Sequence, residues 1–458
     1  MAIEVEIGRG VGVVYLDNPP VNALSAELRK SLFLEITSLN NRDDISAIVI
    51  TGRGRCFCGG ADIREFDKPE RHREPLVPDL IAQIENSTKP LIAAVHGVAL
   101  GGGCELALGC HYRFGSGDAR LGLPEIKLGL MPGAGGTQRL PRLVGLDKAA
   151  AMILSGEPVD AAEALACGLL DRVVEGNLVE SAVDFAGETA ASGAPPRKTS
   201  ALAVKLPESQ ALDRLLESLE ARYLRRSRGL IAPGHCIESI GNAARLPFAE
   251  GMARERELFV RCRESEQSKA QRHLFFAERE ASKITGVSGD DSTLVVERAG
   301  VIGSGTMGAG IAMCFADAGI PVVVHDASPE AMDTARARIR DNYGRSVRRG
   351  RLEDPEASAR IERIRWTDSL HAIADADLVV EAVVEEMEVK RSLFSELDRI
   401  CRRSAILATN TSSLDVDEIA GATRRPEKVI GTHFFSPANV MRLLEIVRAG
   451  QTSAETIA

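Results

Sequence analysis

The pattern of hydrophobic and polar positions divides this chain into three stretches, and the first reads as alternating strands and helices. Residues 3–16 alternate around a glycine turn at 8–12, which predicts two short strands. The apolar runs 47–51 and 90–97 are short and lack a polar face, which is typical of buried parallel strands. Glycine-rich loops and helical patterns follow these runs, so an α/β domain is expected.

Two local features complete the prediction for this stretch. Ser25 precedes a helical pattern and is expected to be its N-cap, because its hydroxyl can accept a bond from a free N–H of the first turn. Residues 67–78 are polar and contain prolines, which predicts a mobile surface loop.

The middle stretch, residues 196–290, changes to long amphipathic helices. Leucines at 212, 215, 216 and 219 form one stripe of a charged helix over 205–226. Similar patterns cover 246–262 and 268–280, and glycine and aspartate residues at 286–291 end the stretch. We interpret it as a helical linker without chemistry, in which His235 and His273 are packing or surface histidines.

Strands and helices alternate again from about residue 291. An apolar strand precedes the glycines at 300–308, a helix follows over 309–318, and a second strand covers 322–326. Three more apolar runs end in polar loops, at 377–385, 406–413 and 429–437. This stretch is therefore a second α/β domain.

Composition excludes several classes of protein. With 458 residues the chain is long enough for two or three domains, and its net charge of -9 argues against a nucleic-acid surface. Nine cysteines without a CxxC pair favour neither a disulfide framework nor a metal site, and they fit a reducing compartment. The acidic N-terminus resembles no signal or transit peptide, and no apolar run is long enough to span a bilayer, so we expect a soluble protein.

Candidate chemistry begins at the glycines 101–103, which open a helical run carrying Glu105. Glycines allow close approach to the backbone, and the N–H groups at a helix start attract negative charge. Glu105 lies among apolar residues, and so does Glu125 further along. A buried carboxylate is costly without a partner or a purpose. The alternative is a structural strand-to-helix turn, where an acid is favoured anyway.

Four segments of the first stretch resemble the enoyl-CoA hydratase/isomerase (crotonase) family, in the family's order and close to its spacing, over residues 5–190. They are FCGGADI, ALGGGCELALGC, LPEIKLGLMPGAGGTQRLPRLVG and SGEPVDAAEALACGLLDRVV. The resemblance implies a crotonase-type ββα spiral domain over residues 1–195.

The resemblance also implies roles for individual residues. The N–H groups of Gly59 and Gly102 would form an oxyanion hole for the thioester oxygen, although the family usually has alanine at position 59. Glu105 would activate water, and Glu125 would give a proton to the α-carbon. Family members limited to double-bond shifting typically keep only the glutamate matching Glu125. Hydration is therefore the leading prediction, and isomerisation through Glu125 alone is the alternative.

Coenzyme A binding is implied for the loop containing Asn22, Ala23 and Leu24, which would lie near the adenine. Arg53 and Arg55 are within reach of the phosphates in this interpretation. A solvated loop is the alternative explanation for both arginines.

The glycines Gly303, Gly305 and Gly308 form a GxGxxG motif between a strand and a helix. In this context they predict a tight turn, pyrophosphate approach and helix packing. Asp326 lies 23 residues beyond Gly303, where a ribose-binding acid ends the second strand. Because its charge would repel a 2′-phosphate, NAD is the expected cofactor of this Rossmann domain.

Residues 294–458 resemble the 3-hydroxyacyl-CoA dehydrogenase family through DLVVEAVVE, ILATNTSS and VIGTHFFSP. The resemblance implies that His433 is the general base, that Glu445 orients its imidazole and that Ser412 binds the substrate oxygen. It also places Glu385 and Lys390 near the nicotinamide. Without the resemblance, a structural histidine is the simpler interpretation of His433.

The three stretches together resemble the multifunctional enzymes of fatty-acid β-oxidation. The domains would be a hydratase/isomerase at 1–195, a helical linker at 196–290 and a dehydrogenase NAD-binding domain at 291–458. The resemblance implies hydration of 2-trans-enoyl-CoA, then NAD-dependent oxidation to 3-ketoacyl-CoA. Its substrates would be acyl-CoA thioesters, its partner a thiolase, and its location the bacterial cytoplasm or the peroxisome; the oligomeric state stays open.

The family continues into a C-terminal helical domain, whereas this sequence ends at Ala458 within a first helical turn. We therefore expect a C-terminally truncated chain in which NAD binds but dehydrogenase turnover is impaired. Two alternatives stay open: an isomerase-dominated enzyme, and a module that binds acyl-CoA or NAD without turnover.

Overall fold

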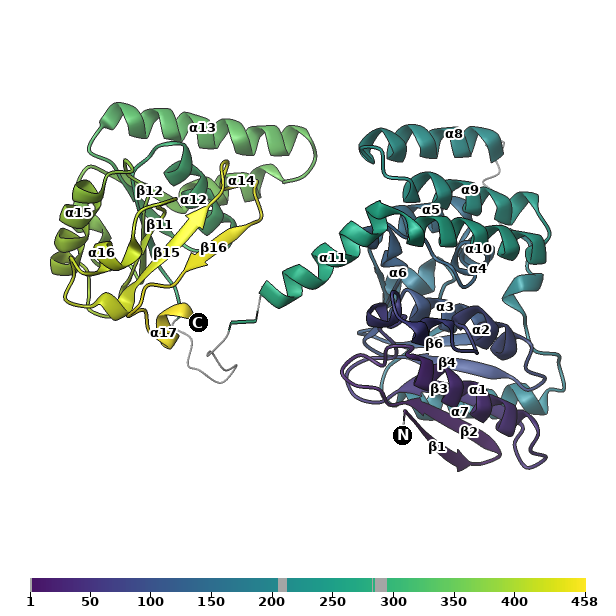
Figure 1. The fold of residues 1–458 in the computed structure, drawn as a ribbon. Coiled ribbons are helices and arrows are strands. Elements are labelled where there is room, and N and C mark those ends of the chain that lie inside the picture. Colours follow the sequence, from purple (N-terminus) through teal and green to yellow (C-terminus); the bar gives the residue numbers. More distant parts are fainter. Residues whose placement is uncertain (1, 205–211, 282, 285–294) are drawn as a thin grey trace. The chain divides into compact units, whose positions relative to one another are not determined.

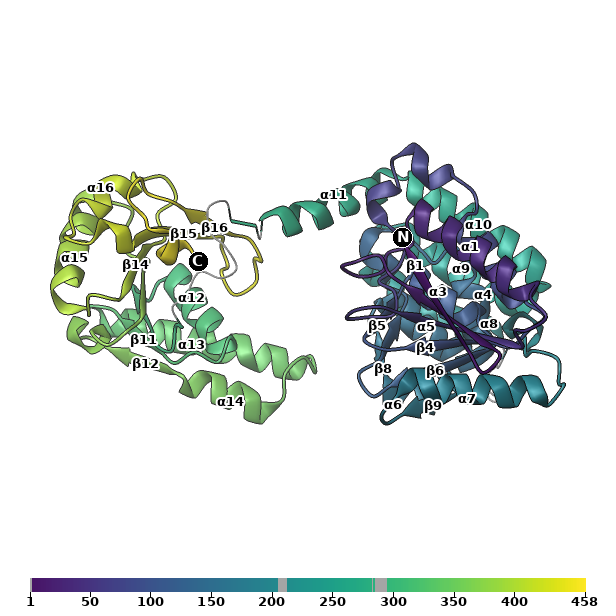
Figure 2. The same cartoon turned by 90° about the horizontal axis from the view of Figure 1, so that it is seen from below.

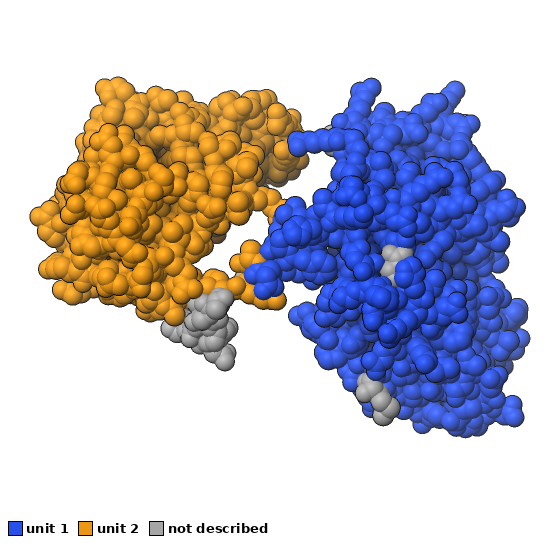
Figure 3. Space-filling view, viewed as in Figure 1, with its two compact units in different colours: residues 1–280 blue, residues 281–458 orange. Residues whose placement is uncertain are grey.

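A computed structural model describes residues 2–204, 212–281, 283–284 and 295–458. They form two compact units, residues 1–280 and 281–458 (Figure 3). The start of the helix predicted over 205–226 and the breaker predicted over 286–291 lie outside the described residues. No described helix is long and apolar enough to cross a lipid bilayer.

The first unit is built on a six-stranded sheet in the order β1-β2-β3-β4-β6-β9. The β1–β2 pair is antiparallel and every other pair is parallel, as predicted for the short apolar runs. A smaller sheet has the order β5-β7-β8. The strands are β1 (Ile3–Gly8), β2 (Val11–Leu16), β3 (Ala47–Gly52), β4 (Leu91–Val95), β5 (Val98–Leu100), β6 (Tyr112–Ser116), β7 (Arg120–Gly122), β8 (Val159–Asp160) and β9 (Arg172–Val174).

Successive side chains of a strand point to opposite faces of the sheet, and in the central strands of this sheet nearly all of them are apolar. Both faces are therefore covered by helices. On one face Val13 packs with Ala182 of α7, and on the other Val14 packs with Leu28 of α1. Ser25 caps α1 as predicted, accepting a bond from Leu28 N. The helices are α1 (Ala26–Asn40), α2 (Val77–Glu85), α3 (Gly102–Gly109), α4 (Gly136–Val144), α5 (Leu146–Ser155), α6 (Ala161–Ala166) and α7 (Leu178–Ala191), with 3₁₀ turns η1 (Ile63–Glu65), η2 (Pro69–His72), η3 (Pro124–Leu128) and η4 (Thr199–Ala201).

The segment 67–78 is tied to α1, which differs from the predicted mobile loop. The Arg29 guanidinium is buried, and it donates to Pro75 O at 3.0 Å and to Arg73 O at 3.3 Å. It also pairs with Glu65 at 3.3 Å. The five N–H donors of one arginine thus hold a polar, proline-containing segment that the sequence alone describes as a loop.

The helices after residue 196 belong to the first unit, which corrects the prediction of a separate linker without chemistry. Ile240 of α9 and Leu258 of α10 are buried in the same core as the sheet. Figure 1 shows α9 and α10 beside α4 and α5. The added elements are α8 (Leu212–Tyr223), η5 (Leu224–Arg226), α9 (Ala232–Arg245), α10 (Phe248–Glu264) and α11 (Glu266–Ala281).

The second unit has a seven-stranded sheet in the order β12-β11-β10-β13-β14-β15-β16, parallel except for the antiparallel edge strand β16. This is the Rossmann arrangement that the glycine motif predicts. The strands are β10 (Ala299–Ile302), β11 (Val322–His325), β12 (Ile364–Thr367), β13 (Leu378–Glu381), β14 (Ile406–Thr409), β15 (Val429–Phe434) and β16 (Leu444–Val447).

Two separate cores form on the two faces of this sheet. Helices α12, α13 and α14 cover one face, and α15 and α16 cover the other (Figure 2). Ser453 caps the last helix, and its hydroxyl accepts a bond from Thr456 N. The helices are α12 (Thr306–Asp317), α13 (Pro329–Arg348), α14 (Asp354–Glu362), α15 (Met387–Ile400), α16 (Val416–Ala420) and α17 (Ala454–Ile457), with η6 (Leu370–Ile373) and η7 (Pro426–Lys428).

Candidate active sites

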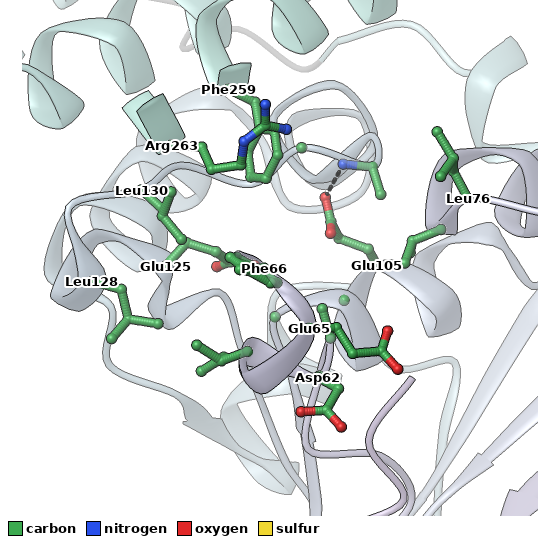
Figure 4. Close-up of a pocket in the computed structure, with 18 of the residues that line it drawn as sticks. Asp62, Glu65, Phe66, Leu76, Glu105, Glu125, Leu128, Leu130, Phe259 and Arg263 are labelled. Carbon is green, nitrogen blue, oxygen red and sulfur yellow. Dashed lines mark hydrogen bonds between the residues drawn. The ribbon is translucent and has the colours of Figure 1, made fainter. Parts of the chain in front are cut away.

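A pocket in the first unit gathers the candidate residues of the hydratase/isomerase motifs (Figure 4). Glu105 enters it from α3 and Glu125 from η3, and Gly59 and Gly102 line it as well. Helix α10 forms another wall through Arg256, Phe259 and Arg263. The segments that the sequence predicted to act together therefore meet in one cavity, and the supposed linker completes it.

Glu105 is held by backbone N–H groups at the start of α4. Its Oε1 accepts from Ala134 N at 2.8 Å and from Gly136 N at 2.9 Å. Burial raises the pKa of this carboxyl above its usual value, and the two N–H donors oppose this shift without cancelling it. Donors aimed at one oxygen stabilise the ionised form.

Glu125 has the opposite surroundings. Its Oε2 is buried and has no hydrogen-bond partner among the described residues. Burial, followed by the nearby Glu105, raises its pKa well above the usual value of a carboxyl. A neutral, protonated Glu125 beside an N–H-bound Glu105 is an arrangement in which one group can give a proton while the other accepts one.

The structure corrects one member of the predicted oxyanion hole. The N–H of Gly59 donates to Val21 O at 2.7 Å, so it is not available to a ligand. Within the described part of the chain, no carbonyl accepts from the N–H of Ala61 or of Gly102. These two groups are close together, since a Cβ placed on Gly102 would lie 3.2 Å from Ala61 N. Both residues line the pocket.

The loop predicted to bind coenzyme A has a structural function at Asn22. Its Nδ2 donates to Arg53 O at 3.0 Å and to Cys56 O at 2.8 Å, and the residue is buried. The Leu24 side chain is also buried, so of the three predicted residues only Ala23 is partly accessible.

The two arginines of the next loop contact protein groups. Arg53 forms ion pairs with Glu4 at 2.8 Å and with Glu6 at 2.7 Å. Arg55 Nε donates to Pro20 O at 3.1 Å. The solvated-loop interpretation fits these contacts, and Arg53 is already neutralised by its partners.

Sequence reasoning missed Glu255 of α10. This residue is fully buried, and its Oε1 accepts from Gly135 N at 2.6 Å while Oε2 accepts from Thr137 N at 2.9 Å. A signal was present in the sequence, because Glu255 lies on the buried stripe of α10 with Gly251 and Leu258. A carboxyl group on the buried face of an amphipathic helix is costly to bury unless it is hydrogen-bonded or paired, so its position predicts a contact with another element.

The glycines of the second unit occupy the three positions that the motif predicts. Gly303 has φ +95°, and a Cβ there would lie 2.6 Å from Ala382 O. A Cβ on Gly308 would lie 1.8 Å from Gly303 O, so helix α12 approaches the turn only without a side chain. At Gly305, the N-cap of α12, a Cβ would meet nothing within 4 Å. That open side of the helix N-terminus suits a pyrophosphate.

Asp326 follows β11, where a ribose-binding acid is expected. Its Oδ2 accepts from Ser304 N and from Ser304 Oγ, both at 2.7 Å, and its Oδ1 accepts from Ser328 N at 2.9 Å. Burial alone would raise the pKa of Asp326, but these bonds outweigh it and the pKa is lowered. The carboxylate therefore stays charged and fixes the glycine turn.

Ser412, His433 and Glu445 form one hydrogen-bonded chain. His433 Nε2 lies 3.1 Å from Ser412 Oγ, and its Nδ1 lies 2.7 Å from Glu445 Oε2. The antiparallel pairing of β15 with β16 sets His433 opposite Glu445, which explains how a spacing of twelve residues becomes a contact.

Glu385 and Lys390 lie next to this hydrogen-bonded chain, and Glu385 contacts it directly through Ser412. Glu385 Oε1 accepts from Ser412 N at 2.8 Å, and its Oε2 pairs with Lys390 at 3.2 Å. Lys390 is buried and also pairs with Glu381 at 2.7 Å. The prediction placed Lys390 near the nicotinamide, whereas its ammonium is enclosed by these two carboxylates.

The two units together define a class of protein: an acyl-CoA hydratase/isomerase fold joined to an NAD-binding dehydrogenase fold. Residues 6–222 match the family "Enoyl-CoA hydratase/isomerase", and residues 298–458 match "3-hydroxyacyl-CoA dehydrogenase, NAD binding domain". Over these two regions the chain is similar to multifunctional enzymes that carry both domains in this order.

Curated relatives match along the whole chain. A peroxisomal bifunctional enzyme of Danio rerio is 42% identical over 99% of this chain and 62% of its own length. The human peroxisomal bifunctional enzyme is 40% identical over 100% of this chain and 63% of its own length. The peroxisomal fatty acid beta-oxidation multifunctional protein MFP2 of Arabidopsis thaliana is 36% identical over 98% of this chain and 63% of its own length. The chain thus spans less than two thirds of these relatives.

Proposed function

We propose that the first unit hydrates 2-trans-enoyl-CoA to 3-hydroxyacyl-CoA. The observation that supports this most directly is the pair of unlike carboxyl groups in one pocket. Glu105 is bound by two N–H groups, and Glu125 has a buried oxygen without a hydrogen-bond partner in the described part of the chain. Ionised Glu105 takes a proton from water as its oxygen attacks the β-carbon, and protonated Glu125 gives its proton to the α-carbon. Glu105 then releases its proton to solvent water and Glu125 takes one up, which restores the starting state.

The charge that develops on the thioester oxygen needs donors. In our proposal these are the N–H groups of Ala61 and Gly102, which have no carbonyl acceptor within the described structure. The loss of one such donor typically costs about 3–4 kcal/mol of transition-state stabilisation. Isomerisation of 3-enoyl-CoA would use the same donors and Glu125 alone, because it moves a proton without adding water.

The test is the absorbance of the enoyl thioester when the chain is mixed with crotonyl-CoA. We expect the absorbance to fall as the double bond is hydrated. A 3-enoyl-CoA substrate measured beside it separates the alternatives, since a shift much faster than hydration would indicate an isomerase. No change with either substrate would contradict the proposal and leave acyl-CoA binding without turnover.

We further propose NAD-dependent oxidation of the 3-hydroxyacyl-CoA product by the second unit. The chain Ser412–His433–Glu445 favours this reaction. Ser412 Oγ binds the substrate hydroxyl, His433 Nε2 removes its proton, and Glu445 stabilises the resulting imidazolium. NAD, when bound, supplies the hydride acceptor.

Together the two reactions are consecutive steps of fatty-acid β-oxidation, because the product of the first is the substrate of the second. The names of the relatives favour a peroxisomal location, and the bacterial cytoplasm is the alternative location in this proposal. A thiolase is the partner that this proposal implies, since it consumes a 3-ketoacyl-CoA.

NAD binding gives a prediction that does not depend on turnover. Gly305→Ala adds a methyl group into open space, so we expect the chain to fold normally but to lose NAD affinity by about tenfold or more, because the pyrophosphate must approach that position. Isothermal titration with NAD and thermal unfolding measure the two effects.

Gly344→Ala is the matched control, because Gly344 lies within α13 and alanine keeps its helical geometry. Gly319→Ala is unsuitable, because Gly319 has φ +83° and alanine would be strained there. Unchanged NAD affinity in Gly305→Ala would contradict the assignment of Gly305 to the pyrophosphate.

A further inference from the structure

Backbone N–H groups 134–137 hold two carboxylates in alternation. Glu105 accepts from Ala134 and Gly136, while Glu255 accepts from Gly135 and Thr137. Successive N–H groups at the start of α4 thus point to opposite sides, one toward the pocket residue and one toward α10. The two N–H groups bound to Glu105 therefore cannot reorient unless the two N–H groups bound to Glu255 move as well.

Glu255 is also fixed by side chains. Thr137 Oγ1 donates to Glu255 Oε2, and Ser239 Oγ of α9 lies 2.6 Å from Thr137 Oγ1. Glu255 is fully buried, whereas the residues that line the pocket from the same helix are Arg256, Phe259 and Arg263. It therefore lies behind the loop and does not face a substrate.

We propose that Glu255 is a positioning residue of the hydratase, which holds the 134–137 loop so that Glu105 keeps its two N–H donors and its orientation toward water. This inference rests on the proposed hydration. Burial, and then the nearby Glu105, raise the pKa of Glu255 to about 8. Both carboxyl groups bind to the same run of four consecutive N–H groups and lie close together. A change in the charge of one therefore alters the pKa of the other.

The experiment replaces Glu255 by glutamine in the full chain. A glutamine presents an NH₂ group where the carboxylate had a second acceptor, so one N–H of the loop loses its partner. We expect kcat for crotonyl-CoA hydration to fall by about 10²-fold, as for a misplaced catalytic group, with KM changed by less than about threefold. Glu257→Gln is the matched control, because Glu257 is exposed on the same helix.

A second comparison separates positioning from general stability. If Glu255 acts through Glu105, then Glu255→Gln lowers the residual rate of a Glu105→Gln chain by little, because the two losses are not additive. A purely structural role would lower both backgrounds equally. Urea unfolding reports whether each variant is folded.

Each outcome of these experiments either supports or overturns the positioning role of Glu255. Reduced kcat with non-additivity supports the proposal, and a folded Glu255→Gln chain with the parent's kcat overturns it while hydration stands. If Glu255→Gln does not fold, Thr137→Val removes the hydroxyl that donates to Glu255, together with its contacts to Gln138 and Ser239, and keeps the two N–H donors of the loop to Glu255. A lowered kcat there supports the inference, and an unchanged kcat overturns it. A parent chain that does not hydrate overturns the proposed function itself.

Discussion

Replacing Glu125 by glutamine is expected to lower kcat for crotonyl-CoA hydration by about 10²–10⁴-fold, because an amide cannot give a proton to the α-carbon. Isomerisation of 3-enoyl-CoA should fall with it. Replacing Glu105 instead should abolish hydration to a similar degree but leave isomerisation, since that reaction needs only Glu125. Absorbance assays with the two substrates on the two variants give four rates that test these roles.

Glu157→Gln is the control for these variants, because Glu157 is exposed and pairs with Lys127 in the same η3 segment. Equal hydration by the parent and by Glu125→Gln would remove Glu125 from the mechanism. The pH profile adds an independent check. Since burial and Glu105 raise the pKa of Glu125, its acidic proton is present at low pH and is lost as the pH rises through that pKa. We expect kcat/KM to have an alkaline limb, and this limb should be absent from the residual activity of Glu125→Gln.

Replacing His433 by glutamine has the second largest expected effect. Without an imidazole to remove the hydroxyl proton, NADH formation from 3-hydroxybutyryl-CoA should fall by about 10²–10⁴-fold relative to the parent. Hydration should stay at the parent's rate, because Glu105 and Glu125, to which we assign it, lie in the other unit. Absorbance of NADH, read in both reaction directions, measures the loss.

His371→Gln is the matched control, because His371 is exposed and belongs to η6 of the same unit. NAD binding by His433→Gln should equal that of the parent, since the glycine turn and Asp326 are unchanged. A variant that forms NADH at the parent's rate would show that another group is the base.

Much of the fold and of both candidate sites is determined by local properties of the sequence. The short apolar runs become parallel strands, and Ser25 caps its helix, because periodicity and capping depend on neighbours a few residues away. The GxGxxG turn likewise has Gly303, Gly305 and Gly308 in the geometry that the motif predicts. Glu105 and Glu125 could be named from the sequence because each lies at a fixed position in a segment that resembles the family.

What only the tertiary structure decided concerns partners that are distant in sequence. The resemblance implied Gly59 as an oxyanion-hole donor, but the Val21 carbonyl, in the turn before α1, accepts its N–H. Glu255 contacts the 134–137 loop across 120 residues of sequence, and this contact makes α10 part of the first unit instead of a linker. Each residue other than proline has one backbone N–H. Whether that N–H is available to a substrate depends on which segment packs against it. That is a property of the folded chain and not of any local pattern.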